Sequence, residues 1–509
     1  MLTDDILFLT VHELSAQIRA KKISPVELTR SYLDRLEKLG PRLGAVATLT
    51  ADLALEQARD AEKEIAAGHS RGPLHGIPFG AKDLLATRGI PTTWGAPPFR
   101  DQVFDFDATV IRKLRSAGAI LVAKRSMIEL AGGGGYSNAS ASLQGPSRCP
   151  FNLDYWAGGS SSGPGASVPS ALVGFAIGSE TLGSIITPSA FSGVSGLRPT
   201  YGRVSRYGAM ALSWTMDKLG PMCRSAIDCG LVLNAIAGRD PADPTSLDSS
   251  FTWWPPQQKK GKPLAGKKIG VIQPDFSRGG DAEVASAYAK ALDVLRSLGA
   301  TLEETLFPDY PYGAIATTLY TAEAASIFRP FIESGKVMEL LNEPQKVGLV
   351  AALSIPAKDY LDAFRLRAEI QPAIGKMFEK YDALVAPSRN TPANRVDADL
   401  AGAPPARPAA AQGAPATPPA DAQRPAPAPA PAPAPTPTTP PQPPADTRNT
   451  ISASNIAGLP ALSVPCGYTK INLPIGIQFV ADALRDDVCI EFAAAYQSIT
   501  DFHRKRPSL

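Results

Sequence analysis

The first seventy residues carry apolar side chains at helical spacing, separated by residues that favour helix starts and ends. Thr10–Glu13 and Ser24–Glu27 both fit the capping box, in which a Ser or Thr and a Glu three residues later satisfy free N–H groups of the first turn. We expect the second helix to end at Gly40 and a third to run from about Thr50 to Gly68. Residues 1–70 therefore predict a layer of helices, to which we assign no chemistry.

Beyond Gly72, short apolar runs alternate with amphipathic helices. The run Ile77–Ala81 lies between Gly and Pro residues, which predicts a buried strand that ends at Lys82. A helix is expected at about 108–118 and a further strand at 119–124. This alternation of strands and helices is typical of an α/β fold.

The second half of the chain repeats the alternation. From about Leu264 the pattern predicts a strand, a helix over 282–298 and a strand over 300–306, which form one strand–helix–strand crossover. More helix follows to about Lys380, and a last helix closes the chain at about Thr500. Between these helices, short core strands are expected in DALVAPS (382–388), NIAGLPALSVPCGY (455–468) and LPIGIQFVA (473–481).

Ala–Pro repeats dominate the sequence between Gly402 and Asp446. Of the 49 prolines, 17 fall between residues 401 and 450, and this density forbids helix and internal strand. We expect 402–446 to be a disordered, extended surface insertion. A more specific alternative is that the segment is a Pro-rich ligand for a recognition domain, but the repeat is low-complexity and lacks a defined PxxP array with basic flanks.

Charge, cysteine usage and hydropathy narrow the class of protein. A formal net charge of +3 and a pI of about 8.5 are too mild to predict binding to nucleic acid or to an anionic membrane. The 5 cysteines have neither zinc-site spacing nor an even count, so we expect no metal, no cofactor and no disulfide framework. The N-terminus shows no signal peptide pattern, and no apolar run reaches the roughly 18 residues of a spanning helix. We therefore expect a cytoplasmic protein with a small-molecule substrate.

The stretch Gly158–Arg206 is the best candidate for a functional site. It opens with GGSSSG, continues through small and apolar residues, and reaches GSETLGSIITP, which contains Ser184. Gly and Ser let the backbone approach a ligand closely and present main-chain N–H groups to it. A phosphate-binding loop has a similar composition, but the Lys-Ser/Thr ending of a P-loop is absent, so we do not predict phosphate binding.

A serine nucleophile needs a base, and the sequence offers two candidates. Of the 4 histidines, only His75, in the loop before Lys82, is placed to serve in a Ser-His-Asp triad. Lys82 is the other candidate, because a desolvated lysine in its neutral form accepts a proton. Its pKa would have to fall by roughly 3 units, about 4 kcal/mol, which an apolar site can supply. The alternative is that Lys82 is solvated or paired with Asp83.

Three motifs resemble those of the amidase signature family of serine amidohydrolases. They are GIPFGAKD around Lys82, GGSSSG around Ser160 and ETLGSIITPSAFSGVSGLRPTYGRVSR around Ser184, in the family's order and separation. The resemblance covers nearly the whole chain apart from the Pro-rich insertion. It implies an α/β fold with a single large mixed β-sheet flanked by helices, and with the N-terminal helices packed outside.

The resemblance also implies how the chain is organised. We expect a single domain over residues 1–509, in which 72–230 form the catalytic core and 264–400 with 450–509 complete the α/β unit. A homodimer is a further expectation, because dimers are common among relatives.

The resemblance assigns a role to each motif. Ser184 would attack an amide carbonyl, Ser160, preceded by a cis peptide bond after Gly159, would relay its proton, and Lys82 would be the base. The oxyanion hole would be formed by the main-chain N–H groups of Thr181, Leu182, Gly183 and Ser184. Such donors stabilise the negative charge that develops on the carbonyl oxygen.

The sequence departs from the family pattern in the loop around the nucleophile. Leu182 stands where glycine is usual, Glu180 where aspartate is usual, and Ile186 where arginine normally follows. We interpret the Glu180 and Ile186 changes together as the loss of an acid–arginine pair. Pro169 falls inside the helix expected after GGSSSG, which predicts a kink or a late helix start.

Three functions are compatible with these residues. The first is an amidase that hydrolyses a small-molecule amide through an acyl-enzyme on Ser184. The second is suggested by YGRVSRYG from Tyr201, which resembles the A-subunits of glutamyl-tRNA amidotransferases, where the same chemistry frees ammonia from glutamine inside a complex. The third is a catalytically impaired scaffold with the same fold.

Overall fold

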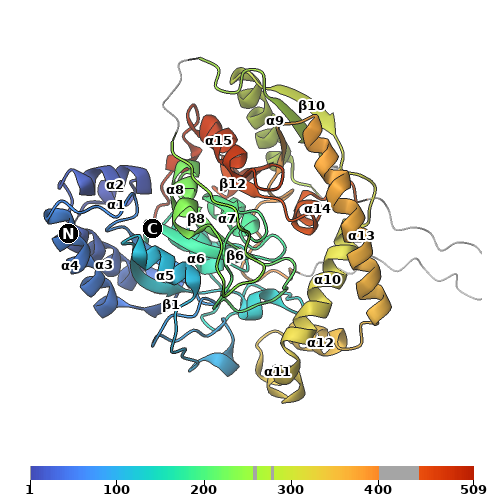
Figure 1. Cartoon of the computed structure of the whole chain (residues 1–509), viewed down its shortest axis with the longest axis horizontal. Coiled ribbons are helices and arrows are strands. Elements are labelled where there is room, and N and C mark those ends of the chain that lie inside the picture. Colours follow the sequence, from blue (N-terminus) through green and yellow to red (C-terminus); the bar gives the residue numbers. More distant parts are fainter. Residues whose placement is uncertain (1, 256–260, 275, 277–279, 401–445) are drawn as a thin grey trace, which may run out of the picture.

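One mixed β-sheet runs through the computed structural model (Figure 1). The structure describes residues 2–255, 261–274, 276, 280–400 and 446–509. Within them, 11 strands pair in the order β1-β3-β2-β6-β8-β7-β12-β13-β11-β9-β10. The expectation of one large mixed sheet is confirmed. The strands are β1 (Val46–Leu49), β2 (Pro78–Lys82), β3 (Ile120–Arg125), β6 (Phe175–Glu180), β7 (Ser195–Arg198), β8 (Lys218–Cys223), β9 (Lys268–Ile272), β10 (Thr301–Thr305), β11 (Ala383–Pro387), β12 (Ala461–Tyr468) and β13 (Pro474–Val480).

Helices flank this sheet, and a separate pair of short strands, β4 (Arg148–Cys149) and β5 (Asn152–Trp156), lies beside it. Figure 1 shows the N-terminal helices at one end of the molecule and α10–α13 at the other. The helices are α1 (Asp4–Leu7), α2 (Val11–Arg19), α3 (Pro25–Leu43), α4 (Ala51–Ala66), α5 (Thr109–Ser116), α6 (Ser162–Ser167), α7 (Ile186–Ser192), α8 (Ala226–Ile236), α9 (Ala282–Ser297), α10 (Tyr312–Ile327), α11 (Arg329–Glu333), α12 (Glu343–Ala352), α13 (Ala357–Gly375), α14 (Thr450–Ile456) and α15 (Asp486–Gln497). Single 3-10 turns lie at Pro97–Phe99, Glu129–Gly132, Lys336–Glu339, Lys376–Glu379 and Phe502–Arg504.

Both predicted helix starts are present. Thr10 accepts a hydrogen bond from Glu13 N, and the Glu13 carboxylate accepts one from Thr10 N at 2.8 Å, so this capping box is complete. Ser24 accepts from Glu27 N at 3.1 Å, but its hydroxyl donates to Glu62, so only half of the second box forms.

The prediction that the second helix ends at Gly40 is wrong. Helix α3 continues through Pro41 to Leu43 and ends at Gly44, whose left-handed φ of 57° suits glycine. Gly40 instead allows a close contact inside the fold, since a Cβ there would lie 2.7 Å from Val46 Cγ2. The missing side chain lets β1 pack closely against the helix.

Two other predicted elements need correction. Helix α6 starts at Ser162 and ends at Ser167, so Pro169 lies beyond the helix and causes neither a kink nor a late start. Proline has no N–H to continue the helical hydrogen bonds, which is consistent with a helix that ends before it. Residues 455 and 456 belong to helix α14 and not to a strand, because Asn449 caps that helix by accepting from Ser452 N at 3.0 Å. The predicted crossover is confirmed by the parallel pairing of β9 with β10 around α9.

The register of the central strands brings two functional segments together. Strand β2 runs parallel to β6 with Ala81 opposite Ile177. Parallel strands end at the same edge of a sheet, so Lys82, the last residue of β2, lies beside the last residues of β6. The loop that carries Ser184 begins at this point.

The predicted insertion at 402–446 lies outside the described residues except for Asp446, whose carboxylate accepts from Gly313 N at 2.9 Å. No helix in the described part of the chain has the length and apolar content to cross a membrane.

We predict that Gly220→Ala destabilises the centre of the sheet. A Cβ at Gly220 would lie 2.0 Å from the carbonyl oxygen of Leu197 in β7, and a main-chain atom cannot move aside without disturbing the pairing of β7 with β8. We expect a loss of at least about 2 kcal/mol, seen as a lower melting temperature in calorimetry.

Gly375→Ala is the matched control for this substitution. Its Cβ would meet no heavy atom within 4 Å, so the melting temperature should be unchanged or slightly higher. An unchanged melting temperature for Gly220→Ala would contradict the close approach of β7 and β8.

Candidate active site

Lys82 is fully buried at the end of β2, where its amine is surrounded by serine hydroxyls. The Nζ atom lies 2.8 Å from Ser160 Oγ, 3.0 Å from Ser161 Oγ and 2.9 Å from Ser179 Oγ. The alternative of a solvated or Asp83-paired lysine is wrong. Asp83 pairs instead with Lys124, at 3.1 Å between Oδ1 and Nζ.

The surroundings of Lys82 favour its neutral form. Burial lowers the pKa of Lys82 from 10.5 to about 7, although the charges of Asp217 and Glu180 act in the opposite direction. The shift agrees with the roughly 3 units that a lysine base requires. A large fraction of Lys82 is therefore unprotonated near neutral pH.

Ser160 and Ser184 lie on two loops that are joined by main-chain contacts. Ser160 is fully buried and follows a cis peptide bond after Gly159, as the resemblance implied. Ser184 is half-buried in the loop between β6 and α7. Ser161 N donates to Ser184 O at 3.3 Å, which ties the loop of Ser184 to the segment that contacts Lys82.

The main-chain N–H groups of the Ser184 loop divide into two sets. Those of residues 181–184 donate no hydrogen bond to another described residue. The next two, of Ile185 and Ile186, donate to the Glu180 carboxylate at 2.8 Å and 3.0 Å. Glu180 thus holds the start of α7 and leaves the four preceding N–H groups available to a ligand.

Glu180 is also the centre of a buried charge cluster. Its carboxylate accepts from Arg198 Nη1 at 2.9 Å and from Asn455 Nδ2 at 2.9 Å, and all three side chains are buried. The interpretation that an acid–arginine pair is lost at both ends is therefore wrong at Glu180, which takes its arginine from β7. Ile186 lies in an apolar cluster.

The charges around Glu180 keep it ionised. Burial alone would raise its pKa, but the positive charges of Arg198 and Lys218 and the donated hydrogen bonds lower the pKa of Glu180 to about 2. Lys218 donates to Asn455 Oδ1 at 2.6 Å, and burial lowers the pKa of Lys218 well below its ordinary value.

Thr181 is fixed from the other side of the loop. Its hydroxyl donates to Asp217 Oδ1 at 2.5 Å, and Asp217 Oδ2 accepts from Leu212 N at 2.7 Å and Ser213 N at 2.9 Å. Burial raises the pKa of Asp217, although these donors oppose the shift. The loop of Ser184 is thus held by two carboxylates, that of Glu180 at its start and that of Asp217 through Thr181.

Ser184 lines a cavity of about 330 Å³, a volume within the range of small-molecule sites. Leu182 also lines it, so the residue that departs from the family pattern faces the substrate space. Its aromatic lining residues are Tyr136, Trp156, Phe191 and Tyr320. Arg389 is the one charged side chain among the described residues that line it.

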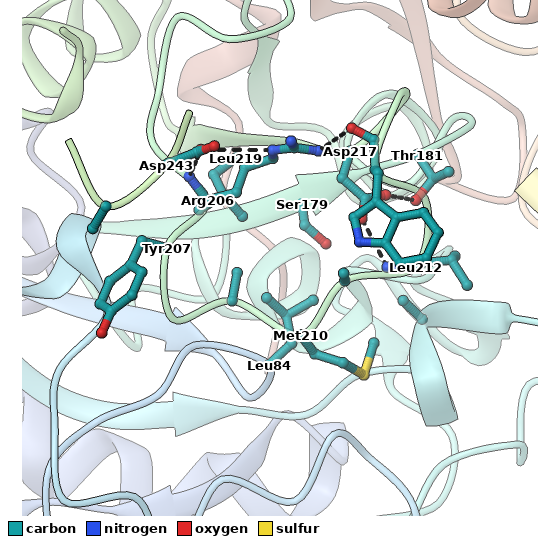
Figure 2. Close-up of a pocket in the computed structure, with 15 residues that line it drawn as sticks. Leu84, Ser179, Thr181, Arg206, Tyr207, Met210, Leu212, Asp217, Leu219 and Asp243 are labelled. Carbon is teal, nitrogen blue, oxygen red and sulfur yellow. Dashed lines mark hydrogen bonds and ion pairs between the residues drawn. The ribbon is translucent and has the colours of Figure 1, made fainter. Parts of the chain in front are cut away.

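A smaller cavity of about 170 Å³ is lined by Ser179, one of the serines that contact Lys82, but not by Lys82 itself. Ser179, whose hydroxyl lies 2.9 Å from Lys82 Nζ, lies between Arg206 above and Leu84 below in Figure 2. Ala131, Thr181 and Leu212 line both cavities and therefore separate them. This smaller cavity lacks Ser184 and falls below the usual ligand volume, so the larger cavity is the candidate substrate site.

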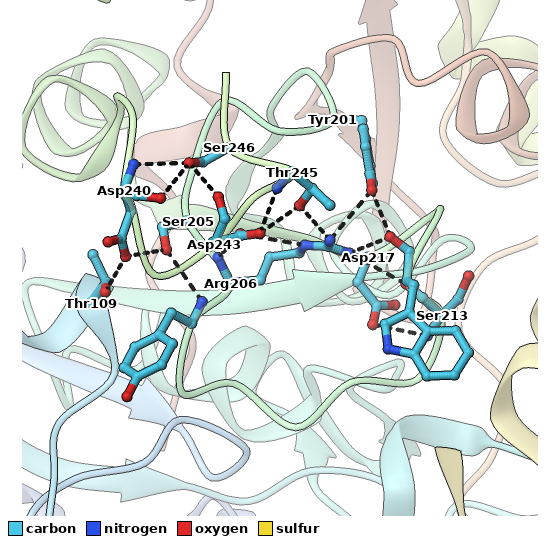
Figure 3. Close-up of polar contacts among 12 residues, drawn as sticks. Thr109, Tyr201, Ser205, Arg206, Ser213, Asp217, Asp240, Asp243, Thr245 and Ser246 are labelled. Carbon is cyan, nitrogen blue, oxygen red and sulfur yellow. Dashed lines mark hydrogen bonds and ion pairs between the residues drawn. The ribbon is translucent and has the colours of Figure 1, made fainter. Parts of the chain in front are cut away.

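Polar contacts brace the wall of the smaller cavity (Figure 3). Arg206 donates to Thr245 Oγ1 at 2.5 Å and to Tyr201 OH at 3.3 Å, and Arg206 N donates to Asp243 Oδ2 at 2.7 Å. Ser205 donates to Asp240 at 2.7 Å. These contacts fix the YGRVSR segment beside the lysine.

The side chain of His75 contacts Arg71 and Glu64 rather than the serines around Lys82. Its Nδ1 accepts from Arg71 N at 3.1 Å and its Nε2 lies 3.3 Å from Glu64. The described residues include no group of three or more His, Cys, Asp or Glu side chains that could hold a metal ion.

Sequence reasoning missed several residues that the structure places around the site. Ser161 lies in GGSSSG and Ser179 in GSETLGSIITP, so their position inside these motifs was the available signal. Arg198, Asn455 and Arg389 come from distant parts of the chain, and no local pattern connects them to Ser184.

Comparisons with known proteins show the family of this chain. The chain belongs to the amidase family, because the family model described as Amidase matches residues 27–423. It is therefore an enzyme of the class that acts on amide C–N bonds.

Its sequence is similar to the A-subunit of glutamyl-tRNA(Gln) amidotransferase from Moorella thermoacetica, with 36% identity over 99% of each chain. Its structure is similar to native peptide amidase from Stenotrophomonas maltophilia, with a TM-score of 0.77 and 29% identity over 98% of each chain. The corresponding amidotransferase chain from Thermotoga maritima has the same fold, with a TM-score of 0.73 and 24% identity over 100% of this chain and 98% of that one.

We predict that Glu180→Gln destabilises the fold in a pH-dependent way. The folded-state pKa of about 2 lies below the ordinary value of 4.5, so the ionised carboxylate contributes stability above about pH 4.5. That contribution, roughly 3 kcal/mol, is lost as the pH falls from 4.5 towards 2. Melting temperatures of wild type and Glu180→Gln should therefore differ at pH 7 and converge in acid.

Glu304→Gln is the control, because this side chain is exposed on β10 and should change stability by less than about 0.5 kcal/mol. A Glu180→Gln variant as stable as wild type at pH 7 would show that the charge cluster does not depend on this carboxylate.

Proposed function

We propose that this chain cleaves an amide C–N bond through an acyl-enzyme on Ser184, with Ser160 as proton relay and Lys82 as base. The observation that best supports this proposal is the buried Lys82 amine with a pKa of about 7, placed 2.8 Å from Ser160 Oγ. An amine that is neutral near the working pH is suited to remove a proton and return it.

Hydrogen-bond counting supports the direction of the relay. A neutral lysine amine has two N–H groups and one lone pair, so one of its three serine partners must donate to it. Ser161 Oγ donates instead to Ser179 O at 3.1 Å, which leaves Ser160 or Ser179 as the donor. Donation from Ser160 leaves its own oxygen free to take a proton from Ser184.

The proposed reaction balances around this relay. Ser184 Oγ attacks the amide carbon, its proton passes to Ser160, and the Ser160 proton passes to Lys82. The C–N bond then breaks as the Lys82 proton returns through Ser160 to the leaving nitrogen. Water hydrolyses the acyl-enzyme by the same route. The N–H groups of residues 181–184, which have no acceptor among the described residues, would stabilise the carbonyl oxyanion.

Of the two settings for this chemistry, an ammonia-producing subunit within a complex is the better supported. The relative from Moorella thermoacetica is named as a subunit, and it is 36% identical to this chain over 99% of both lengths. The amide substrate in this setting would be glutamine. The free-standing amidase is the second candidate, which the 29% identity to peptide amidase over 98% of each chain favours. The impaired scaffold is the least supported, because the lysine and its serine contacts are all retained.

We predict that a small fluorophosphonate labels Ser184 at a rate that rises with pH. Attack of Ser184 on phosphorus releases fluoride and sends the serine proton to Lys82, so the rate should increase up to about pH 7 and then level off. Lys82→Ala should lower this rate by about 10²- to 10⁴-fold. The measurement is intact mass and peptide mapping over a pH series.

Ser184→Ala is the control and should take up no label. Label on another residue, or a rate independent of Lys82 in a folded variant, would contradict the proposed roles.

We predict that the tagged chain, expressed in its native cells, purifies with partner subunits. Alone it should be a weak glutaminase, and the partners should raise its rate, because an ammonia-producing subunit is coupled to the acceptor reaction. Mass spectrometry and glutaminase assays measure both outcomes. Rapid turnover of simple amides by an unpartnered chain would favour the free-standing amidase.

A further inference from the structure

The cavity in front of Ser184 contains an unpaired positive charge. Arg389 is the one charged side chain among the described lining residues, and it is exposed; it also lines a neighbouring cavity of about 500 Å³. No carboxylate among the described residues lies within ion-pair distance of its guanidinium, in contrast to Arg198 and Arg206, which have acidic partners. A cation held in this way is free to pair with an anionic ligand.

The protein around Arg389 disfavours the charged form of its guanidinium. Although the side chain touches solvent, desolvation by the surrounding protein lowers the pKa of Arg389, and the nearby hydroxyl of Tyr136 only partly opposes the shift. An anion in the cavity would offset this desolvation, and a charge pair in a partly enclosed site is stronger than one at the surface.

The main chain on both sides of Arg389 is fixed. Ser388 is buried; its N donates to Gly476 O at 2.8 Å, and its hydroxyl lies 2.7 Å from Ser463 Oγ. On the other side, Asp281 N donates to Asn390 O at 2.9 Å. The guanidinium is therefore carried by a segment just after β11 whose main chain is hydrogen-bonded on both sides.

The rest of the described lining is uncharged and combines aromatic rings with polar side chains such as Thr187 and Asn394. Tyr136 packs edge-on against Trp156 with ring centroids 6.0 Å apart, and Trp156 packs in the same way on Phe191 at 6.4 Å. Arg389 is therefore the one group in the described lining that can select a charge on a ligand, while the aromatic rings and uncharged polar side chains surround the rest of a small molecule.

We propose that Arg389 binds a carboxylate of the substrate, so that the chain acts on primary amides whose acyl part carries a carboxylate. The inference rests on the proposed function, because the amide must reach Ser184 in the same cavity. With a primary amide the leaving group is ammonia, which leaves the acyl part as the only place for the charge. Arg389 is then a specificity-determining residue for the reaction.

The test compares two amides of equal length, glutaramic acid and pentanamide, which differ by a carboxylate against a methyl group. Wild type should favour glutaramic acid in kcat/KM, and Arg389→Ala should lower the ratio of the two kcat/KM values by about 100-fold. Arg389→Lys should restore part of it, because lysine keeps the charge without the bidentate fork. Arg395→Ala is the matched control, since Arg395 is exposed and pairs with Asp397 at 3.0 Å.

Two further measurements separate this inference from the proposed function. Fluorophosphonate labelling of Ser184 tests the chemistry with a probe that has no carboxylate. Calorimetric binding of glutarate to Ser184→Ala, with and without Arg389→Ala, tests recognition without turnover. Labelling with an unchanged kcat/KM ratio would overturn the role of Arg389 and leave the chemistry standing. Glutarate binding that depends on Arg389, without labelling, would uphold the recognition and overturn the chemistry.

Discussion

The complete burial of the Lys82 amine is the constraint on which the rest of the site depends. An exposed lysine would be charged at neutral pH and could not accept a proton. Strand β2 carries Lys82 into the centre of the sheet, and the serine hydroxyls of two other segments replace the water that it has lost. Burial changes the acidity of the amine, and the hydroxyls keep its polar atoms hydrogen-bonded without adding a charge.

A second buried group, Glu180, gives the nucleophile loop its shape. One carboxylate contacts the start of α7, an arginine from β7 and an asparagine from α14. Its hydrogen bonds go to the N–H groups of Ile185 and Ile186, and the four N–H groups before them donate to no other described residue. The same negative charge raises the pKa of Lys82, although burial has the larger effect. The two groups therefore have to be considered as one electrostatic unit.

The residues proposed for the chemistry and the residue proposed for recognition come from different parts of the fold. Lys82, Ser160 and Ser184 lie at strand ends and loops within the first two hundred residues, beside the middle of the sheet. Arg389 follows β11, which is separated from β6 by four strands in the sheet order. The family could change its substrates through such distant loops while it keeps the lysine and serines.

The sequence by itself determined most of the local elements and the candidates for the reacting groups. Helix caps such as Thr10 with Glu13 act over three residues, and the GIPFGAKD, GGSSSG and GSETLGSIITP motifs are contiguous, so both can be found without a fold. The tertiary structure decided the rest. Gly40 makes room for Val46 of β1 and does not end α3, and Glu180 pairs with Arg198, 18 residues away on another strand. The pKa of Lys82 and the unpaired charge of Arg389 follow from burial and from charges on other segments, which only the packing of the sheet brings together.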